Sequence, residues 1–349
     1  MAALYRLRQR RRLRRPKIYR DRTNPLDTFD DIELHDKLRF RRQDILELTD
    51  LLTNDLELDN RGGAVPPSLQ VCVTLRYFAT GTFQNAIGEM IGISQPTVSL
   101  IVKRTMNALL RRFPDFIHPP AMQDINRNKI EFQEMAGFPN VFGCIDGTHI
   151  KIVAPPGNDE DVYVNRKNVY SINVQIVCGA RLRILDCVAT SPGSFHDARI
   201  LRESAFWRAM EGEPRAVPQG LILGDSAYPI REWLMTPYAQ PVNRQQERFN
   251  VSHKSTRVTV ERCIGVLKRR WHCLHTELRL SPLRCSKLIY CCAMLHNFAV
   301  ERAAQQEICP FQNDAEQQDH PPPPAVMGND RARMVAGQVV RNRLTENFF

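Results

Sequence analysis

The hydrophobic pattern of this 349-residue chain changes its period near residue 139, and this change most constrains the fold. Before it, segments such as residues 41–58 place apolar side chains every three or four positions, which predicts amphipathic helices. After it, four short runs are apolar or alternate with polar residues and end at turn residues, which predicts strands. These runs are residues 140–145, 169–178, 183–190 and 221–223.

Helices are also predicted between and after these strands, from His196 to about Met210 and over about 257–273 and 283–304. This order is typical of an α/β fold with a mixed central sheet flanked by helices. The expected parts are a basic, largely disordered arm at 1–40, an all-helical helix-turn-helix domain at 41–135, an α/β domain at 136–305, and a proline-containing linker with a tail helix (about 329–346) at 306–349.

The positive charge of the chain is concentrated in its first residues. The net charge is +10, yet residues 1–22 hold ten basic side chains and one acid, which leaves the other 327 residues nearly neutral. So basic a segment has too little apolar surface to fold alone. It is suited to nucleic acid phosphates, nuclear import or an anionic membrane surface, and a solvated tail without function stays an alternative.

The ten cysteines are scattered and form no Cys-x-x-Cys pair, which argues against a structural zinc site and favours reduced core cysteines. No run of about 18 apolar residues predicts a membrane span, so no membrane partner is expected. We therefore expect an intracellular protein, in the nucleus and also in the cytoplasm.

A helix pair joined by a tight turn is predicted over residues 83–110, with Gly92-Ile93-Ser94 as the turn. Ser94 is placed to cap the second helix, and Lys103 and Arg104 lie away from its apolar side. A helix-turn-helix of this kind can insert its second helix into the major groove of DNA. An ordinary helical bundle with the same short turn stays open as the alternative.

Four acids occupy positions that favour a metal site. Asp146 and Asp225 each follow an apolar strand, Asp197 opens a helix, and Glu261 lies inside a helix. Acids that follow strands collect at the carboxyl edge of a sheet, where ligands bind, and neighbouring carboxylates need a proton or a cation between them. Oxygen ligands without a matching Cys or His set favour Mg²⁺ or Mn²⁺. The simpler alternatives are a turn residue at Asp225, a helix cap at Asp197, and a surface pair between Glu261 and Arg257.

Several motifs around these acids resemble the catalytic blocks of PIF/Harbinger-type transposases, including the Harbinger transposase-derived nucleases of animals. The motifs are Gly-Cys-Ile-Asp-Gly-Thr-His at 143–149, Ser-Phe-His-Asp-Ala at 194–198, Leu-Gly-Asp-Ser-Ala-Tyr-Pro at 223–229, and Val-Glu-Arg-Cys-Ile-Gly-Val-Leu-Lys-Arg-Arg-Trp at 260–271. The 35 residues between Asp225 and Glu261 also match the spacing of such enzymes. The resemblance covers about 75–300.

The resemblance implies an RNase H-like fold with Asp146, Asp225 and Glu261 as the DDE triad and Asp197 as a fourth acid of the metal site. It also implies a pair of divalent cations, Mg²⁺ or Mn²⁺, DNA as the substrate, and a separate Myb-like DNA-binding protein as a partner. A homo-oligomer stays open.

Both lines of reasoning predict a divalent-metal-dependent DNA endonuclease that hydrolyses, and in strand transfer joins, phosphodiester bonds. A DNA-binding or adaptor protein with an inactive nuclease domain is the alternative, and a small-molecule phosphohydrolase is a weaker one. His149 and His196 are interpreted as positioning residues. The predicted DNA contacts are Lys103, Arg104, Arg166, Lys167 and Lys268.

Overall fold

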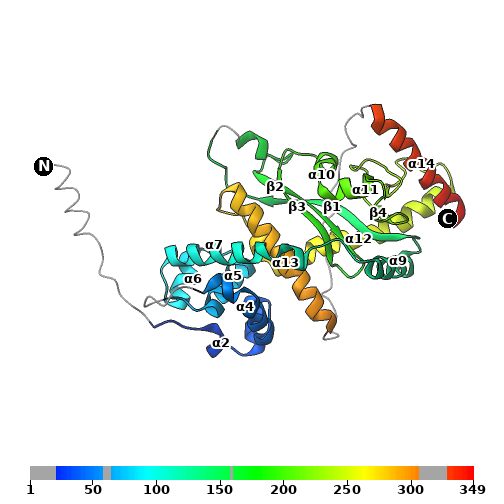
Figure 1. Ribbon diagram of the computed structural model, residues 1–349. Coiled ribbons are helices and arrows are strands. Elements are labelled where there is room, and N and C mark those ends of the chain that lie inside the picture. Colours follow the sequence, from blue (N-terminus) through cyan, green and yellow to red (C-terminus); the bar gives the residue numbers. More distant parts are fainter. Residues whose placement is uncertain (1–20, 58–63, 158–159, 306–327) are drawn as a thin grey trace.

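The structure is a computed structural model that describes residues 21–57, 64–157, 160–305 and 328–349 (Figure 1). Its first half is helical, as the sequence predicts. The helices are α2 (Pro25–Thr28), α3 (Asp31–Leu38), α4 (Arg42–Leu56), α5 (Pro67–Thr80), α6 (Gln84–Ile91), α7 (Gln95–Arg111), α8 (Phe113–Phe116) and α9 (Met122–Ala136).

The expected arm of residues 1–40 differs from the structure over its second half. Residues 25–28 and 31–38 form α2 and α3. Asp30 is the N-cap of α3 and forms a capping box, in which its side chain accepts from Glu33 N and the Glu33 side chain accepts from Asp30 N. Leu34 and Leu38 of α3 are fully buried, so this segment belongs to the helical core. Residues 1–20, which hold nine of the ten basic side chains of the predicted arm's first 22 residues, lie outside the described residues.

The helix pair α6 and α7 lies where the sequence predicts it, with Gly92 in the left-handed region at φ 83°. A Cβ on Gly88 would come within 2.5 Å of the Ile93 carbonyl oxygen, so the close turn requires glycine there. Ser94 takes the N-cap position, but its hydroxyl lies 2.9 Å from the Thr97 hydroxyl and caps no backbone amide. The role of this pair in DNA binding remains a prediction.

The second half contains the predicted mixed sheet. Its strands are β1 (Val141–Lys151), β2 (Ser171–Cys178), β3 (Ile184–Pro192), β4 (Leu221–Leu223) and β5 (Leu234–Met235), in the order β3-β2-β1-β4-β5. The pairs β1–β2 and β2–β3 are antiparallel, and β1–β4 and β4–β5 are parallel. The expected α/β class is confirmed, although β5 was not predicted because two residues give no readable alternation.

Strand β1 is longer than the predicted run of 140–145. It continues to Lys151 because residues 144–151 pair with β2, so Asp146 lies inside the strand and the prediction that it ends the strand is wrong. The parallel neighbour β4 stops at Leu223, opposite Cys144. Beyond this point β1 has lost its neighbour on that side, which opens an edge at Asp146.

Helices α10 (Asp197–Glu203) and α11 (Ala205–Glu211) lie between β3 and β4, and α12 (Arg244–Arg270), α13 (Pro282–Gln305) and α14 (Gly328–Phe348) follow β5. Short 3-10 turns occur at Glu160–Tyr163 and His272–Leu274. The single helix expected from His196 to about Met210 is two helices, because the Ser204 hydroxyl caps α11 by accepting from Trp207 N at 2.9 Å. The helix predicted at 257–273 starts 13 residues earlier, with Asn243 as its N-cap. The prediction missed this start because the first turns of the helix are polar and show no apolar periodicity.

Helices cover both faces of the sheet (Figure 1). On one face, α12 and α13 bury Cys144, Ile176 and Cys187 in a core that continues into the N-terminal helices. On the other face, α10 and α11 pack over a second cluster that includes Ile145 and Val177. Since neighbouring strand residues point to opposite faces, each position of β1 is assigned to one layer. In the described part of the chain all nine cysteines are buried and unbridged, and no helix is long and apolar enough to cross a bilayer.

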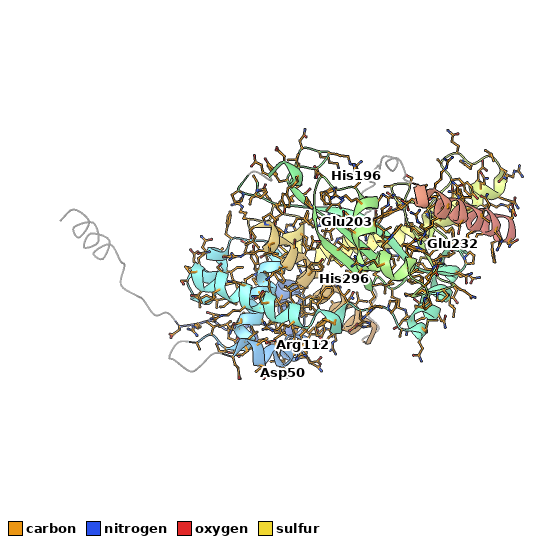
Figure 2. All side chains as sticks on the ribbon, turned by 45° about the horizontal axis from the view of Figure 1, so that its top comes forward. Asp50, Arg112, His196, Glu203, Glu232 and His296 are labelled. Carbon is orange, nitrogen blue, oxygen red and sulfur yellow. The ribbon has the colours of Figure 1, made fainter. Side chains whose placement is uncertain are left out.

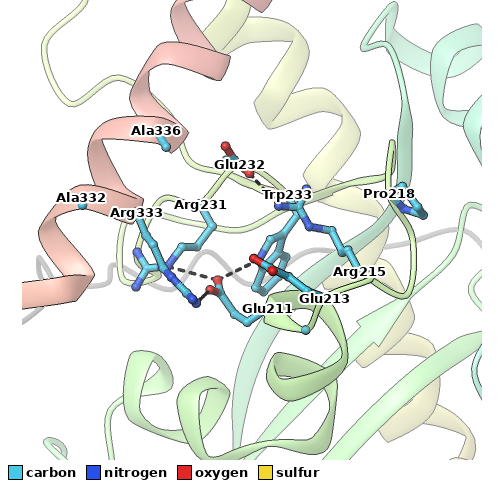
Figure 3. Close-up of a pocket in the computed structure, with 11 residues that line it drawn as sticks. Glu211, Glu213, Arg215, Pro218, Arg231, Glu232, Trp233, Ala332, Arg333 and Ala336 are labelled. Atoms are coloured by element: carbon cyan, nitrogen blue, oxygen red, sulfur yellow. Dashed lines mark hydrogen bonds and ion pairs between the residues drawn. The ribbon is translucent and has the colours of Figure 1, made fainter.

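The tail helix α14 docks on the α/β domain through a buried arginine (Figure 3). Arg231 is 1% exposed and pairs with Glu211 at 3.3 Å and with Asp330 of α14. A Cβ on Gly337 of α14 would come within 2.8 Å of the Arg231 backbone, so the helix sits directly on this loop. Arg333 of α14 pairs with the same Glu211. The cavity of about 500 Å³ beside this contact is lined by none of the four candidate acids.

Candidate active site

The sheet register places Asp146 and Asp225 side by side. Cys144 of β1 pairs with Leu223 of the parallel strand β4, and each aspartate follows two residues later. Residues two apart on a strand point to the same face, so Asp146 shares the α12 face with Cys144, whose thiol contacts that helix. Both carboxylates are more than nine-tenths buried. The Asp225 Oδ1 accepts from Ala227 N at 2.9 Å, which fixes the turn after β4.

Helix α12 brings Glu261 to the same place through an arginine one turn earlier. The Arg257 guanidinium donates to Asp146 Oδ2 at 3.2 Å and also to Glu261 Oε1. One side chain therefore bridges an acid of β1 and an acid of α12 that are 115 residues apart in the chain. The predicted alternative, a surface pair between Arg257 and Glu261, is right about the two partners. It leaves out Asp146, and the contact is not at the surface, because Arg257 is only 18% exposed.

Asp197 approaches β1 from the opposite face. A Cβ on Gly147 would lie 2.5 Å from Asp197 Oδ1, and position 147 points away from the side of Asp146. Asn173 of β2 donates from its Nδ2 to Asp197 Oδ1 at 2.8 Å and to the Phe195 carbonyl at 2.9 Å. The predicted fourth acid is thus next to the strand that carries Asp146, but on the α10 side of it.

Tyr228 lies among these acids, and sequence reasoning did not select it. The side chain is 2% exposed, and its hydroxyl has no hydrogen-bond partner among the described residues. Burial, together with the charges of Asp197, Asp146 and Asp225, raises the pKa of Tyr228 well above its ordinary value. The hydroxyl therefore stays protonated, as a donor inside the acidic site. The sequence feature that could have identified Tyr228 is its place in the motif at 223–229, three residues after Asp225.

The positive charge that balances these acids comes from Arg257. Burial disfavours the charged guanidinium, but Asp146, Glu261 and Asp225 outweigh burial and raise the pKa of Arg257 above its ordinary value. Over the residues that the structure describes, no three acidic, histidine or cysteine side chains stand together as ligands for one ion. Asp146 and Glu261 are instead both paired with the guanidinium of Arg257.

The predicted DNA contacts fall in three places. Lys268 follows Glu261 by two turns of α12, and its Nζ donates to the His149 carbonyl at 3.3 Å. Arg166 and Lys167 are exposed in the loop between β1 and β2, where Asn165 accepts from Lys167 N. Lys103 is exposed and Arg104 half-buried on α7.

The two histidines interpreted as positioning residues behave differently. His149 Nδ1 lies 3.0 Å from the Ser171 hydroxyl, which fixes its ring beside β2. His196 is exposed at the start of α10, while the buried His296 belongs to α13 (Figure 2). His296 Nε2 lies 2.8 Å from the Leu182 carbonyl, in the core behind the sheet.

Comparison with known proteins supports the resemblance. Residues 145–297 match the family described as DDE superfamily endonuclease. The chain is 35% identical over 298 residues to "Putative nuclease HARBI1" of Homo sapiens, covering 84% of each chain. The Xenopus laevis protein of the same name is 34% identical over 282 residues, or 79% of this chain and 80% of that one. "Protein ALP1-like" of Arabidopsis thaliana is 30% identical over 263 residues, covering 71% of this chain and 64% of the relative. No solved structure gave a significant match. A DDE endonuclease domain and relatives that match most of the chain show that this protein belongs to the Harbinger transposase-derived nucleases.

Proposed function

We propose that the protein is a divalent-metal-dependent DNA endonuclease of the Harbinger transposase type. The observation that supports this proposal is that Arg257 contacts both Asp146 and Glu261, while Asp225 follows Leu223, the β4 residue that pairs with Cys144 of β1. A single guanidinium spans two of them. Two buried carboxylates and a partly buried one, at the place where β1 loses its parallel neighbour, are what a site for cations requires.

The residues fit a metal of the Mg²⁺ or Mn²⁺ kind. The donors are carboxylate oxygens, which hard cations prefer, and the described cysteines near the sheet are buried in the core. Tyr228 and Asn173 add buried oxygen atoms that lack a hydrogen-bond partner among the described residues. Asp146, Asp225 and Glu261 would hold the ions, with Asp197 as a fourth acid across the strand. When bound, a pair of such ions supplies an activated water and stabilises the leaving oxygen of a phosphodiester.

Helix α12 offers a path for the DNA backbone beside the acids. A Cβ on Gly265, one turn beyond Glu261, would meet nothing within 4 Å. Lys268 lies roughly 10 Å along the helix from Glu261. A phosphate chain that passes over Gly265 would therefore meet the acids on one side and a cation on the other. Arg166 and Lys167 extend this basic border from the neighbouring loop.

Binding outside the cleavage site would depend on α7 and on the basic arm. Lys103 and Arg104 would contact phosphates as the helix-turn-helix meets DNA. We also propose a Myb-like DNA-binding partner, a location in the nucleus and also in the cytoplasm, and a homo-oligomer as the form to look for. These proposals follow from charge and from family resemblance.

Cleavage of supercoiled DNA tests the function directly. Purified protein with Mg²⁺ or Mn²⁺ should nick the plasmid, a chelator should stop the reaction, and Asp146→Asn should abolish it while DNA affinity stays near that of the native protein. Asp50→Asn is the matched control, since Asp50 is an exposed acid on α4, far from the sheet in the chain (Figure 2). DNA binding that is salt-sensitive but never followed by metal-dependent nicking would instead identify a DNA-binding or adaptor protein.

A further inference from the structure

Arg257 occupies the centre of the candidate site without belonging to the acidic triad. Its guanidinium reaches Asp146 Oδ2 at 3.2 Å and Glu261 Oε1, and the nearby Asp225 also raises its pKa. An arginine that paired only with Glu261, one turn away on an exposed helix face, would be an ordinary surface ion pair of little energetic importance. Here the partner on β1 and the burial of the side chain make the contact a tertiary one.

Both oxygens of Asp146 already accept hydrogen bonds, Oδ2 from Arg257 and Oδ1 from Gly147 N at 2.9 Å, and Oε1 of Glu261 accepts from Arg257. A divalent cation that binds these carboxylates therefore competes with the guanidinium for them. The planar fork of arginine fits two carboxylates at once, and a buried acid pair without a cation repels itself. A positive side chain in this position therefore stabilises the acids in the metal-free protein, at the expense of metal affinity.

We propose that Arg257 is an internal counter-ion that holds Asp146 and Glu261 together before metal binding and competes with divalent cations for them. This inference rests on the proposed function, because it takes the two acids as metal ligands. Arg257 acts through these acids and is thus a positioning residue. Metal loading requires its side chain to leave at least one of them.

Direct titration with Mn²⁺ by calorimetry tests this competition without any cleavage reaction. Arg257→Gln should bind Mn²⁺ about tenfold more tightly than the native protein, since the competing charge is absent. It should melt at a lower temperature in chelator, and saturating Mn²⁺ should remove the difference. Lys254→Gln is the control, because it removes the same charge from an exposed position one turn earlier on α12 and should change neither quantity.

Equal or weaker Mn²⁺ binding by Arg257→Gln, or a loss of melting temperature that saturating Mn²⁺ leaves in place, overturns the inference. Arg257→Lys keeps the charge but lacks the fork that spans two carboxylates. If the Gln variant does not fold, the Lys variant must still bind Mn²⁺ more tightly than the native protein, and equal binding by the Lys variant would overturn the inference.

Asp146→Asn separates the counter-ion inference from the proposed metal site. If Asp146→Asn binds Mn²⁺ like the native protein, the proposed metal site is wrong. If Asp146→Asn loses Mn²⁺ binding while Arg257→Gln binds Mn²⁺ like the native protein, the metal site stands and only the counter-ion role of Arg257 is rejected.

Discussion

The backbone of Gly147 lies directly against the carboxylate of Asp197. A Cβ at position 147 would come within 2.5 Å of Asp197 Oδ1 and 2.8 Å of its Cγ, closer than real Cβ contacts. Asn173 holds the same carboxylate at 2.8 Å, so Asp197 has little freedom to retreat. The absence of a side chain at one position of β1 therefore sets where the fourth acid stands relative to Asp146.

Gly147→Ala should displace Asp197 and weaken cleavage about ten- to hundredfold, although both acids remain in the chain. The measurement is plasmid nicking together with thermal melting. Ser255→Ala is the control, because Ser255 is an exposed residue of α12 and the change should leave nicking unaltered and stability within about 0.5 kcal/mol of the native protein. Full activity in Gly147→Ala would mean that the position of Asp197 is irrelevant to the reaction.

Tyr228→Phe should reduce nicking by about ten- to hundredfold, with stability unchanged or slightly higher. Stability should not fall, because the buried hydroxyl has no hydrogen-bond partner among the described residues and its removal breaks no contact. Cleavage should fall, because the acidic site loses a desolvated hydrogen-bond donor. Nicking rates and melting temperatures of the same preparation give the answer. A clear loss of stability with intact cleavage would assign the hydroxyl a structural contact instead.

Gly265→Leu should block access of DNA to the acids. Leucine would project into the open space at Gly265, between Glu261 and Lys268 on α12. The contacts of Arg257 with Asp146 and Glu261 should stay in place. We expect DNA cleavage to fall at least about tenfold and Mn²⁺ binding, measured by calorimetry, to stay the same. Unimpaired cleavage would show that the DNA does not pass over this turn of the helix.

Asp330→Asn should lower the free energy of unfolding by about 1–3 kcal/mol. Arg231 is 1% exposed, so loss of Asp330 on α14 leaves this buried charge with Glu211 as its one carboxylate partner among the described residues. Figure 3 shows Arg231 beside Glu211. Denaturant unfolding measures the change. Arg331→Gln, an exposed neighbour on the same helix, should stay within about 0.5 kcal/mol of the native protein. Equal stability of both variants would show that α14 is not needed to hold Arg231.

Acid should destabilise the protein through His253. Burial lowers the pKa of His253 from 6.5 to about 4, so the unfolded chain binds a proton between these values that the folded protein excludes. Stability is therefore complete above about pH 7 and falls by up to about 3 kcal/mol as the pH drops from 6.5 to 4. Burial raises the pKa of Asp186 to about 6, which acts in the opposite direction over much of this window.

The comparison of native protein with His253→Gln isolates the histidine, since Asp186 is the same in both. Glutamine can still donate to the Met235 carbonyl, which lies 3.1 Å from His253 Nε2. Melting temperatures between pH 7 and 5 should depend less on pH in the variant. The same slope in both proteins would show that His253 does not titrate with unfolding.

Local sequence patterns carried much of the fold. Apolar periodicity located α4, α5, α7, α13 and the four longer or fully apolar strands, and the three-residue β4 was predicted with its exact bounds. The same approach missed the start of α12 and the whole of β5, because polar helix turns and two-residue strands have no period to read. It also stopped β1 at Ile145, since Asp146 ends the apolar run, whereas pairing with β2 continues the strand to Lys151.

The sequence by itself predicted Asp146, Asp225 and Glu261 as one group of acids, because they follow or lie within apolar elements in a recognisable order. Only the tertiary structure decided how they meet. The parallel pairing of Cys144 with Leu223 sets the two aspartates side by side, and the direction of α12 carries Arg257 onto Asp146. The physical reason is that spacing along a chain fixes which face a residue takes within its own element, whereas contacts between elements depend on how sheets and helices pack.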